Sequence, residues 1–300
     1  MKLYKTIRIW LLIAGLGLSL ANVTQANPPS SGLKAWFRSD HGVLTDSFGG
    51  VTNWLDISGN GNHAVQTTYV LEPNTNSAVI GYAAKPVLDV GAGQHMTFDL
   101  PNANLYAGMT VIFVGSPGSS QSDWETVVSS DGVSSDPRFT GGIRWAFGLG
   151  SDSTFAQGLG WAGTGANVNL GNGNILSANA FFLNVYRTDK TAWDVYVSRD
   201  DVATKFSDDL TGAGTISDTS FPTGSFRGVL GTENTDGGSP ATYALNGYIA
   251  EVLIYDHSLS GSEFTDVVNY LNAQYIPEPS TVLLLGIGGL LFWRRRMQRK

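Results

Sequence analysis

The chain has 300 residues, of which 42% are hydrophobic, 11% aromatic and only 14% charged. The absence of cysteine excludes disulfides, thiol catalysis and cysteine-based metal sites. The 37 glycines and frequent aromatic residues are typical of a β-sandwich with many turns, not of a helical domain. Residues 27–275 carry 10 Lys and Arg against 24 Asp and Glu, a net charge of −14, which argues against nucleic acid or anionic lipid as a partner.

The first 26 residues have the three regions of a secretory signal peptide. A basic start precedes the apolar run Ile9–Ala21, and small or polar residues then lead to Ala26. We expect signal peptidase to cut after Ala26, or else after Ala21. The sequence therefore predicts an exported protein.

Eight short strands are predicted in the body, separated by turns rich in Gly, Asn, Asp and Ser. Thr110–Gly115 is nearly all apolar, as expected of a strand buried on both faces. Trp193–Arg199 alternates apolar and polar residues, which indicates a half-buried strand. The predicted strands are Gly32–Arg38, Thr110–Gly115, Glu125–Ser129, Ile143–Leu149, Phe181–Arg187, Trp193–Arg199, Phe226–Gly231 and Gly247–Tyr255.

One short amphipathic helix is predicted to close the body. Ser260 and Glu263 have the spacing of a capping box. Apolar residues then recur from Phe264 to Leu271 with helical spacing. Pro277 ends the helical region.

The chain finishes with a Pro-Glu-Pro motif, an apolar segment and a basic cluster. The apolar segment, Val282–Trp293, has 12 residues, which is short for a bilayer core of about 30 Å. A buried helix of the globular body is disfavoured because the segment has no polar face. By the positive-inside rule, we expect the basic cluster that follows to stay in the cytoplasm.

This tail resembles the PEP-CTERM sorting signal of Gram-negative bacteria. The resemblance implies that exosortase, a membrane-embedded protease-like enzyme, cuts at or near the motif while the segment 282–293 holds the protein transiently in the inner membrane. It also implies release to the cell surface or to an exopolysaccharide matrix. The residues that carry the sorting signal are Pro277, Glu278, Pro279, Arg294, Arg295 and Arg296.

The two ends of the body resemble laminin-G-like, concanavalin A-like domains. The segments that carry this resemblance are Ala35–Phe37, Val51–Ala64 and Leu245–Asp256, followed by the helix Leu259–Tyr275. The resemblance implies an all-β, jelly-roll β-sandwich with one short C-terminal helix. The expected organisation is a signal peptide over 1–26, one sandwich domain over 27–275, and the sorting signal over 276–300.

Catalytic signatures are missing from the sequence. The Glu-x-Asp-x-x-Glu pattern, which this fold uses to place two carboxylates on one strand, does not occur, and the closest acidic pair is Asp123 and Glu125. A turn before a strand is the favoured interpretation of that pair. The four histidines are far apart in the sequence and are expected on the surface or in loops: His41, His63, His95 and His257.

A calcium site is conceivable in the turn that contains Asp56, Asn60 and Asn62, because these residues offer oxygen ligands. Asp and Asn also stabilise such turns without an ion, and that interpretation is favoured.

Acidic pairs at 200–201 and 208–209 are expected on a solvated edge. Candidates for a sugar site, by residue type alone, are Trp124, Trp145, Trp161 and Trp193.

These observations predict a non-catalytic, exported protein of the cell surface or extracellular matrix, and the resemblance implies adhesion or carbohydrate binding as its task. No cofactor is expected apart from calcium in the turn above. Exosortase and signal peptidase are the expected processing partners, and an extracellular polysaccharide is the expected ligand. The alternatives are a divergent glycoside hydrolase or lyase on the same fold, and a structural matrix protein without a discrete ligand.

Overall fold

The computed structural model describes residues 27–80, 83–91, 93–100, 108–117, 125–130, 144–149, 155–159, 168–169, 181–189, 191–199, 206, 212–215, 226–232 and 244–276. The short helices and strands within these residues are β1 Leu33–Arg38, β2 Val43–Thr45, β3 Val51–Trp54, β4 Ala64–Val65, the 3-10 helix η1 Tyr69–Leu71, β5 Asn74–Ile80, β6 Ala83–Val90, β7 Met96–Leu100, β8 Met109–Pro117, β9 Glu125–Ser130, β10 Arg144–Leu149, β11 Phe155–Leu159, β12 Val168–Asn169, β13 Phe182–Thr188, β14 Ala192–Arg199, β15 Gly212–Thr215, β16 Phe226–Leu230, β17 Gly247–Tyr255 and the helix α2 Gly261–Tyr275.

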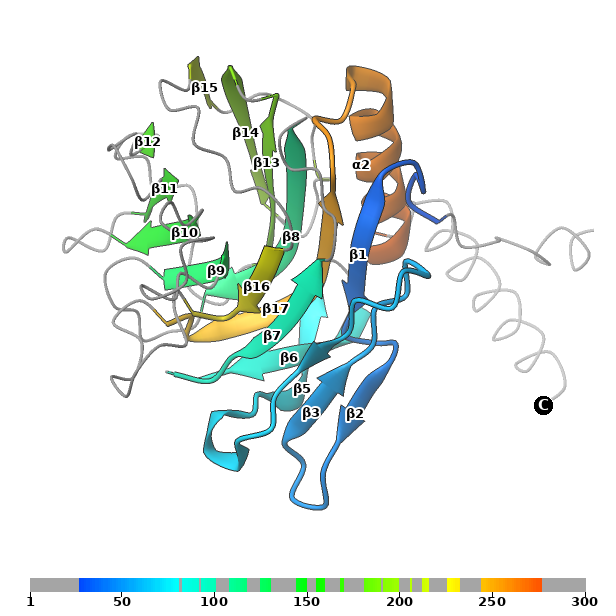
Figure 1. Cartoon of the computed structure of the whole chain (residues 1–300), viewed down its shortest axis with the longest axis vertical. Coiled ribbons are helices and arrows are strands. Elements are labelled where there is room, and N and C mark those ends of the chain that lie inside the picture. Colours follow the sequence, from blue (N-terminus) through cyan, green and yellow to red (C-terminus); the bar gives the residue numbers. More distant parts are fainter. Residues whose placement is uncertain are drawn as a thin grey trace, which may run out of the picture.

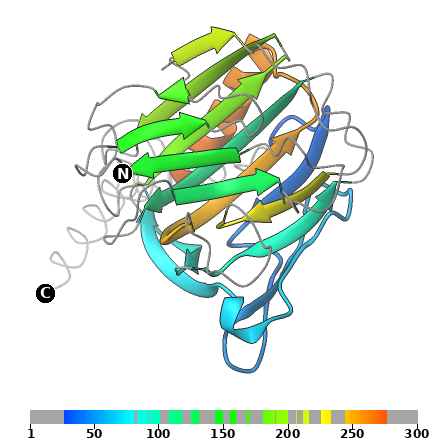
Figure 2. The same cartoon turned by 60° about the vertical axis from the view of Figure 1, so that its left-hand side comes forward.

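The strands form two stacked sheets, and α2 covers the outer face of one of them (Figure 1). Sheet A, which α2 covers, runs in the order β15-β14-β13-β8-β17-β6-β5, and β1 also pairs with β17. Sheet B runs in the order β12-β11-β10-β9-β16-β7-β4-β3-β2. Figure 2 shows the strands of the two sheets from a second direction. This β-sandwich with a single helix at its C-terminal end confirms the predicted fold class.

The core between the two sheets is built from apolar side chains on alternate positions of the strands. Phe37 of β1 lies 5.4 Å, between ring centroids, from both Trp54 of β3 and Phe98 of β7. Phe113 of β8 and Phe182 of β13 extend the same core, with ring centroids 5.8 Å apart. The contacts of Phe37 join residues of the two sheets that are far apart in the sequence and so fix sheet A on sheet B.

A second core lies between sheet A and α2. Ile112 and Val114 of β8 point into it, while Val111 and Phe113 point into the sandwich. The expectation that Thr110–Gly115 is buried on both faces is therefore confirmed. The prediction of a half-buried strand over Trp193–Arg199, which is part of β14, fails at Tyr196. The alternation places Tyr196 on the polar, exposed face, but its ring is buried against Phe264 of α2, with ring centroids 4.4 Å apart.

The helix α2 begins where the capping box predicted it. The Ser260 side chain accepts a hydrogen bond from the Glu263 N–H, and the Glu263 side chain accepts one from the Ser260 N–H. Phe264, Val267 and Leu271 are buried against sheet A, as their spacing predicted. The helix thus connects the last strand, β17, to the C-terminal segment while covering the sheet.

Candidate functional site

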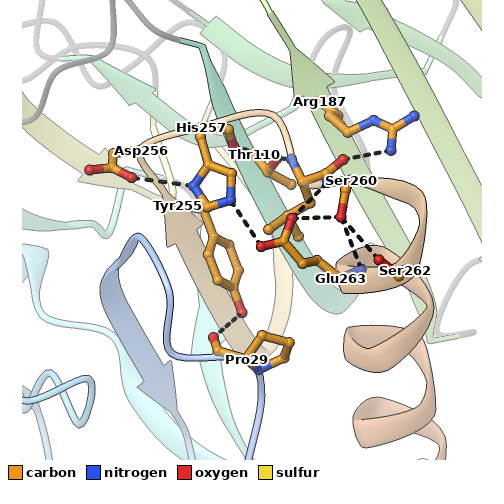
Figure 3. Close-up of polar contacts among 10 residues, drawn as sticks. Pro29, Thr110, Arg187, Tyr255, Asp256, His257, Ser260, Ser262 and Glu263 are labelled. Carbon is orange, nitrogen blue, oxygen red and sulfur yellow. Dashed lines mark hydrogen bonds and ion pairs between the residues drawn. The ribbon is translucent and has the colours of Figure 1, made fainter.

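The candidate site is the turn between β17 and α2, where four polar side chains contact one another (Figure 3). Asp256 and His257 follow directly after the last residue of β17, while Ser260 and Glu263 belong to the cap of α2. The turn from strand to helix brings these residues together. The side chains of Asp256, His257 and Glu263 are partly exposed, at 25%, 29% and 31%, so a solute can reach them.

His257 lies between two carboxylates. Its Nδ1 is 3.3 Å from Asp256 Oδ1, and its Nε2 is 3.5 Å from Glu263 Oε1. Lys34 of β1 forms an ion pair of 2.9 Å with Asp256 Oδ2. An imidazole can accept a proton on one nitrogen and release one from the other. The arrangement can therefore pass protons between a carboxylate and solvent.

Glu263 is the carboxylate that is held in its ionised form. Its Oε2 accepts hydrogen bonds from the Ser260 N–H at 2.9 Å and from the Ser260 hydroxyl at 2.8 Å. These bonds, together with His257, lower the pKa of Glu263. Glu263 is thus ionised and can stabilise positive charge; the lowered pKa makes it a weaker base than an ordinary carboxylate and a poor proton donor.

The turn is fastened to sheet A from below. Thr110 of β8 donates from its hydroxyl to the His257 carbonyl at 2.9 Å and accepts from the Leu259 N–H at 3.0 Å. Arg187 of β13 donates to the Leu259 carbonyl at 2.8 Å, and its guanidinium also pairs with Asp194. Figure 3 shows Thr110 and Arg187 against the turn that carries His257. A turn held in this way keeps His257 and Glu263 in fixed relative positions.

A second polar cluster lies under α2 and is closed to solvent. Glu251 of β17 is fully buried and accepts hydrogen bonds from Trp36 Nε1 at 2.6 Å, the Tyr270 hydroxyl at 2.6 Å and the Tyr275 hydroxyl at 2.8 Å. Burial raises the pKa of Glu251 to about 7, while the three hydrogen bonds and Arg38 oppose that rise. Because no substrate can reach this carboxyl, the cluster fastens α2 to the sheet.

The predicted calcium residues lie together in the loop after β3, next to β1. Asp56 is buried, and its carboxylate accepts hydrogen bonds from the N–H groups of Trp36, Ser58 and Asn62 and from the Ser58 hydroxyl. The side-chain amides of Asn60 and Asn62 donate to backbone carbonyls of β1 at 2.8 and 2.7 Å. The loop thus fastens β1, and calcium binding there stays a prediction.

Most of the other residues singled out from the sequence cannot be placed at a site. Residue 123 and the acidic pairs at 200–201 and 208–209 lie outside the described residues, as do Trp124 and Trp161. The structure places Glu125, Trp145 and Trp193 in strands by their backbone alone. Within the part of the chain that the structure describes, no group of three or more His, Asp or Glu could hold a metal ion.

Sequence analysis did not identify the cluster around His257. It treated His257 as a loop residue and Glu263 as a helix cap, and it did not weigh Asp256. A usable signal exists: an Asp-His pair follows a buried strand directly, and a capping Glu follows six residues after the His. In this chain the helix starts close after the strand, so this order of residues places the three side chains in one turn.

Comparisons with known proteins confirm the sorting signal. Residues 276–296 match the PEP-CTERM protein-sorting motif, and this span includes all six predicted signal residues. The motif implies export, anchoring in the membrane before processing, and processing by exosortase. The predicted segments 1–26 and 282–293 lie outside the described residues, among which no helix is long and apolar enough to cross a membrane.

The sandwich is similar to solved glycosidase structures. The Trypanosoma rangeli sialidase in complex with sialic acid matches with a TM-score of 0.52 and 13% identity, over 84% of this chain and 35% of that chain. The same sialidase with a difluorinated 2-keto-3-deoxy-nononic acid matches with a TM-score of 0.52 and 14% identity, over 92% and 40%. This chain thus spans little more than a third of the sialidase's length, and the likeness establishes the fold.

A third similar structure is domain 4 of AbnA, a GH43 extracellular arabinanase from Geobacillus stearothermophilus, in complex with arabinotriose. It matches with a TM-score of 0.46 and 16% identity, over 79% of this chain and 98% of that chain, and at that TM-score it carries no argument here. No curated protein sequence matches the chain.

These comparisons contradict the prediction of a non-catalytic adhesive or carbohydrate-binding protein. Solved structures that share the fold at a TM-score above 0.5 include those of an enzyme, a sialidase. They favour the alternative, a divergent glycoside hydrolase on the same fold. The sequence-based prediction looked for two carboxylates on one strand, whereas in the structure Asp256 and Glu263 each contact His257 in the turn between β17 and α2. The laminin-G-like identity of the sandwich stays a prediction.

Proposed function

We propose that the protein is a glycan-active hydrolase that is sorted to the cell surface. The single observation that carries this proposal is the fold shared with sialidase over 84% of the chain. One of those sialidase structures holds sialic acid, so a glycosidic bond is the proposed target. The partly exposed cluster of Asp256, His257 and Glu263 supports it, because the cluster supplies the acid and base groups that glycoside hydrolysis requires.

The cluster assigns a role to each side chain in that reaction. Glu263, which is ionised, takes a proton from water as the water oxygen bonds to the anomeric carbon. The bond from that carbon to the leaving oxygen breaks, and the leaving oxygen receives a proton from the His257 imidazolium. Asp256, 3.3 Å from Nδ1, stabilises the positive imidazolium before transfer. Solvent then restores both protonation states.

Export and sorting complete the proposal. The signal peptide over residues 1–26 is removed by signal peptidase, and the sandwich over 27–275 folds outside the cytoplasm. Exosortase then acts on the tail over 276–300, which the motif match at 276–296 supports. The destination is the cell surface or a surrounding polysaccharide matrix, where a secreted glycan-active enzyme meets its substrate.

Glu263→Gln tests the role of the cluster, because Gln keeps the capping box while removing the charge. Purified protein is assayed against fluorogenic sialosides, arabinosides and hexosides. We expect hydrolysis of at least one substrate, with kcat reduced by about 10²–10⁴-fold in Glu263→Gln and in His257→Asn. Asp266→Asn, which removes a charge from an exposed position of the same helix, should keep wild-type activity. Equal activity of Glu263→Gln and wild type would overturn the assignment, and no hydrolysis by wild type would overturn the proposal.

A further inference from the structure

A pair of exposed aromatic rings lies at the end of the molecule that the β2–β3 hairpin and η1 form (Figures 1 and 2). Phe48, in the hairpin turn, is 77% exposed, and Tyr69 of η1 is 59% exposed. Their ring centroids are 5.4 Å apart and the rings meet edge to face. Val70 beside them is 73% exposed. We call Phe48, Tyr69 and Val70 the aromatic platform.

The hairpin half of the platform is held by a tight turn. Asp46 Oδ1 accepts hydrogen bonds from the N–H groups of Phe48 at 2.8 Å and Gly50 at 3.0 Å. The Asp46 N–H donates to the Gly50 carbonyl at 2.9 Å. Gly49 between them has φ +92, a left-handed conformation that favours glycine. The turn thus presents Phe48 to solvent from a defined backbone.

The η1 half is fastened to the same end of sheet B. Gln66 is buried, and its Oε1 accepts from the N–H groups of Thr67 and Thr68, both at 2.9 Å. Its Nε2 donates to the His95 carbonyl at 3.0 Å, just before β7. Gly50 forms a β-bridge with Asn74, and the Val51 N–H donates to the Pro73 carbonyl at 2.8 Å, so the hairpin is joined to the segment that follows η1. A ligand that stacks on the platform therefore meets rings already in place, which lowers the ordering cost of binding.

The segment of chain that carries the platform contains no positively charged side chain, which limits the kinds of ligand that it can bind. No Lys or Arg occurs between Arg38 and Lys85, whereas Asp46 lies beside Phe48. Binding to anionic membranes and anionic polymers relies on cationic side chains. Three exposed side chains are also far fewer than the roughly 20–30 residues a side of a stable protein interface. Flat rings flanked by polar groups instead suit the apolar face of a sugar ring and its hydroxyls.

We propose that Phe48 and Tyr69 form a docking subsite for a neutral polysaccharide chain, apart from the turn that carries His257. The proposal rests on the proposed function, in which a glycan is the substrate. It deepens that function by naming an uncharged polymer as the substrate class. The subsite would hold an insoluble or gel-like chain at the protein while hydrolysis takes place elsewhere on the sandwich.

Affinity electrophoresis of the purified full chain tests the subsite. The gels contain dextran, mixed-linkage β-glucan, arabinan or, as an anionic probe, alginate. We expect retardation in at least one neutral gel, and a weakening of apparent affinity of about tenfold or more in Phe48→Ala/Tyr69→Ala. The matched control is Leu44→Ala/Val65→Ala, which removes exposed apolar side chains from the same sheet end without touching the platform, and it should bind as wild type does.

The outcomes separate the subsite from the enzymatic proposal. The subsite would be overturned if Phe48→Ala/Tyr69→Ala were retarded in the neutral gels as strongly as the wild type, or if the wild type were retarded by alginate alone. It would also be overturned if the wild type bound only to anionic phospholipid vesicles, or if sedimentation showed dimers that depend on the platform. Short soluble glycosides are assayed with the same variants, and Phe48→Ala/Tyr69→Ala should keep the wild-type kcat on them. If no glycoside is hydrolysed but neutral-gel binding still depends on Phe48 and Tyr69, the hydrolase fails and the subsite stands.

Discussion

At the scale of single residues, Glu251 should control how stability depends on pH. Burial raises its pKa in the folded protein from the ordinary value of 4.5 to about 7. Between these values the unfolded chain has released the proton while the folded protein still holds it, so stability falls as pH rises through this window. The difference is roughly 3 kcal/mol at most. Glu251→Gln, which does not titrate, should remove most of that slope.

The measurement is urea unfolding followed by tryptophan fluorescence at about pH 5 and about pH 8. Wild type should lose stability between the two, and Glu251→Gln should lose much less. Glu263→Gln is the control, because the pKa of Glu263 is lowered and its titration lies below this window. An equal pH slope in wild type and Glu251→Gln would show that Glu251 has an ordinary pKa.

The surroundings of Glu251 could not be foreseen from the sequence. It is the one charged residue in the apolar strand β17, which signals an unusual environment. One of its hydrogen-bond partners, Trp36, lies 215 residues earlier in the chain, and the other two, Tyr270 and Tyr275, lie in the helix that follows the strand. A β-bulge between Ile249 and Glu251 also changes which face each side chain occupies. Neither the partners nor the bulge can be derived from the local pattern.

At the scale of elements, the capping box should contribute measurably to stability. Ser260→Ala removes the hydroxyl that accepts from the Glu263 N–H and donates to the Glu263 carboxylate. We expect a loss of about 1 kcal/mol in the free energy of unfolding, within a range of about 0.5–2. Asn269→Ala, at an exposed position of the same helix away from the cap, is the control. Chemical denaturation checks both, and an equal loss in the two variants would contradict a specific role for the cap.

Element prediction from the sequence succeeded where local signals were strong. The α2 cap and the apolar strand Thr110–Gly115 were both recognisable without tertiary contacts. The hairpin β5–β6 was missed because Asn74–Ile80 is polar at its start and Pro86 interrupts its partner strand. Pro86 is tolerated there because β17 pairs with β6 only from Leu88 onward, leaving that part of β6 beside the edge strand β5.

At the scale of the whole molecule, the fold was more predictable than the function. Composition, strand spacing and one closing helix define a sandwich almost by themselves. A sandwich can support enzymes and binding proteins alike, so function depends on side chains that the topology brings together. Asp256 illustrates this, because its ion pair with Lys34 joins the two ends of the body. The exposed pair Phe48 and Tyr69 likewise depends on two loops meeting, which no motif in the sequence records.

The sorting motif begins where the folded body of the protein ends. Tyr275 ends α2 with its hydroxyl on Glu251, Ile276 is still buried at 6% exposure, and the motif match begins at residue 276. A chain of residues 27–276 should therefore melt as the full mature protein does. A chain of 27–269 should not fold, because it loses the buried side chains of Tyr270, Leu271 and Tyr275. Burial of each contributes about 1.5–3 kcal/mol, whereas the whole free energy of unfolding of a protein is about 5–15 kcal/mol.

Thermal unfolding followed by circular dichroism compares the two truncated chains. Equal melting temperatures would contradict the role of the last helical turn. Melting of the 27–276 chain well below the full protein would show instead that the sandwich depends on its sorting tail. If the expected result holds, removal of everything after residue 276 leaves the core complete, whereas a cut after residue 269, about two turns earlier, removes two of the three donors to Glu251. A processing enzyme that releases a stable protein must then cut on the C-terminal side of Ile276, because the buried side chains at the end of α2 continue to Ile276.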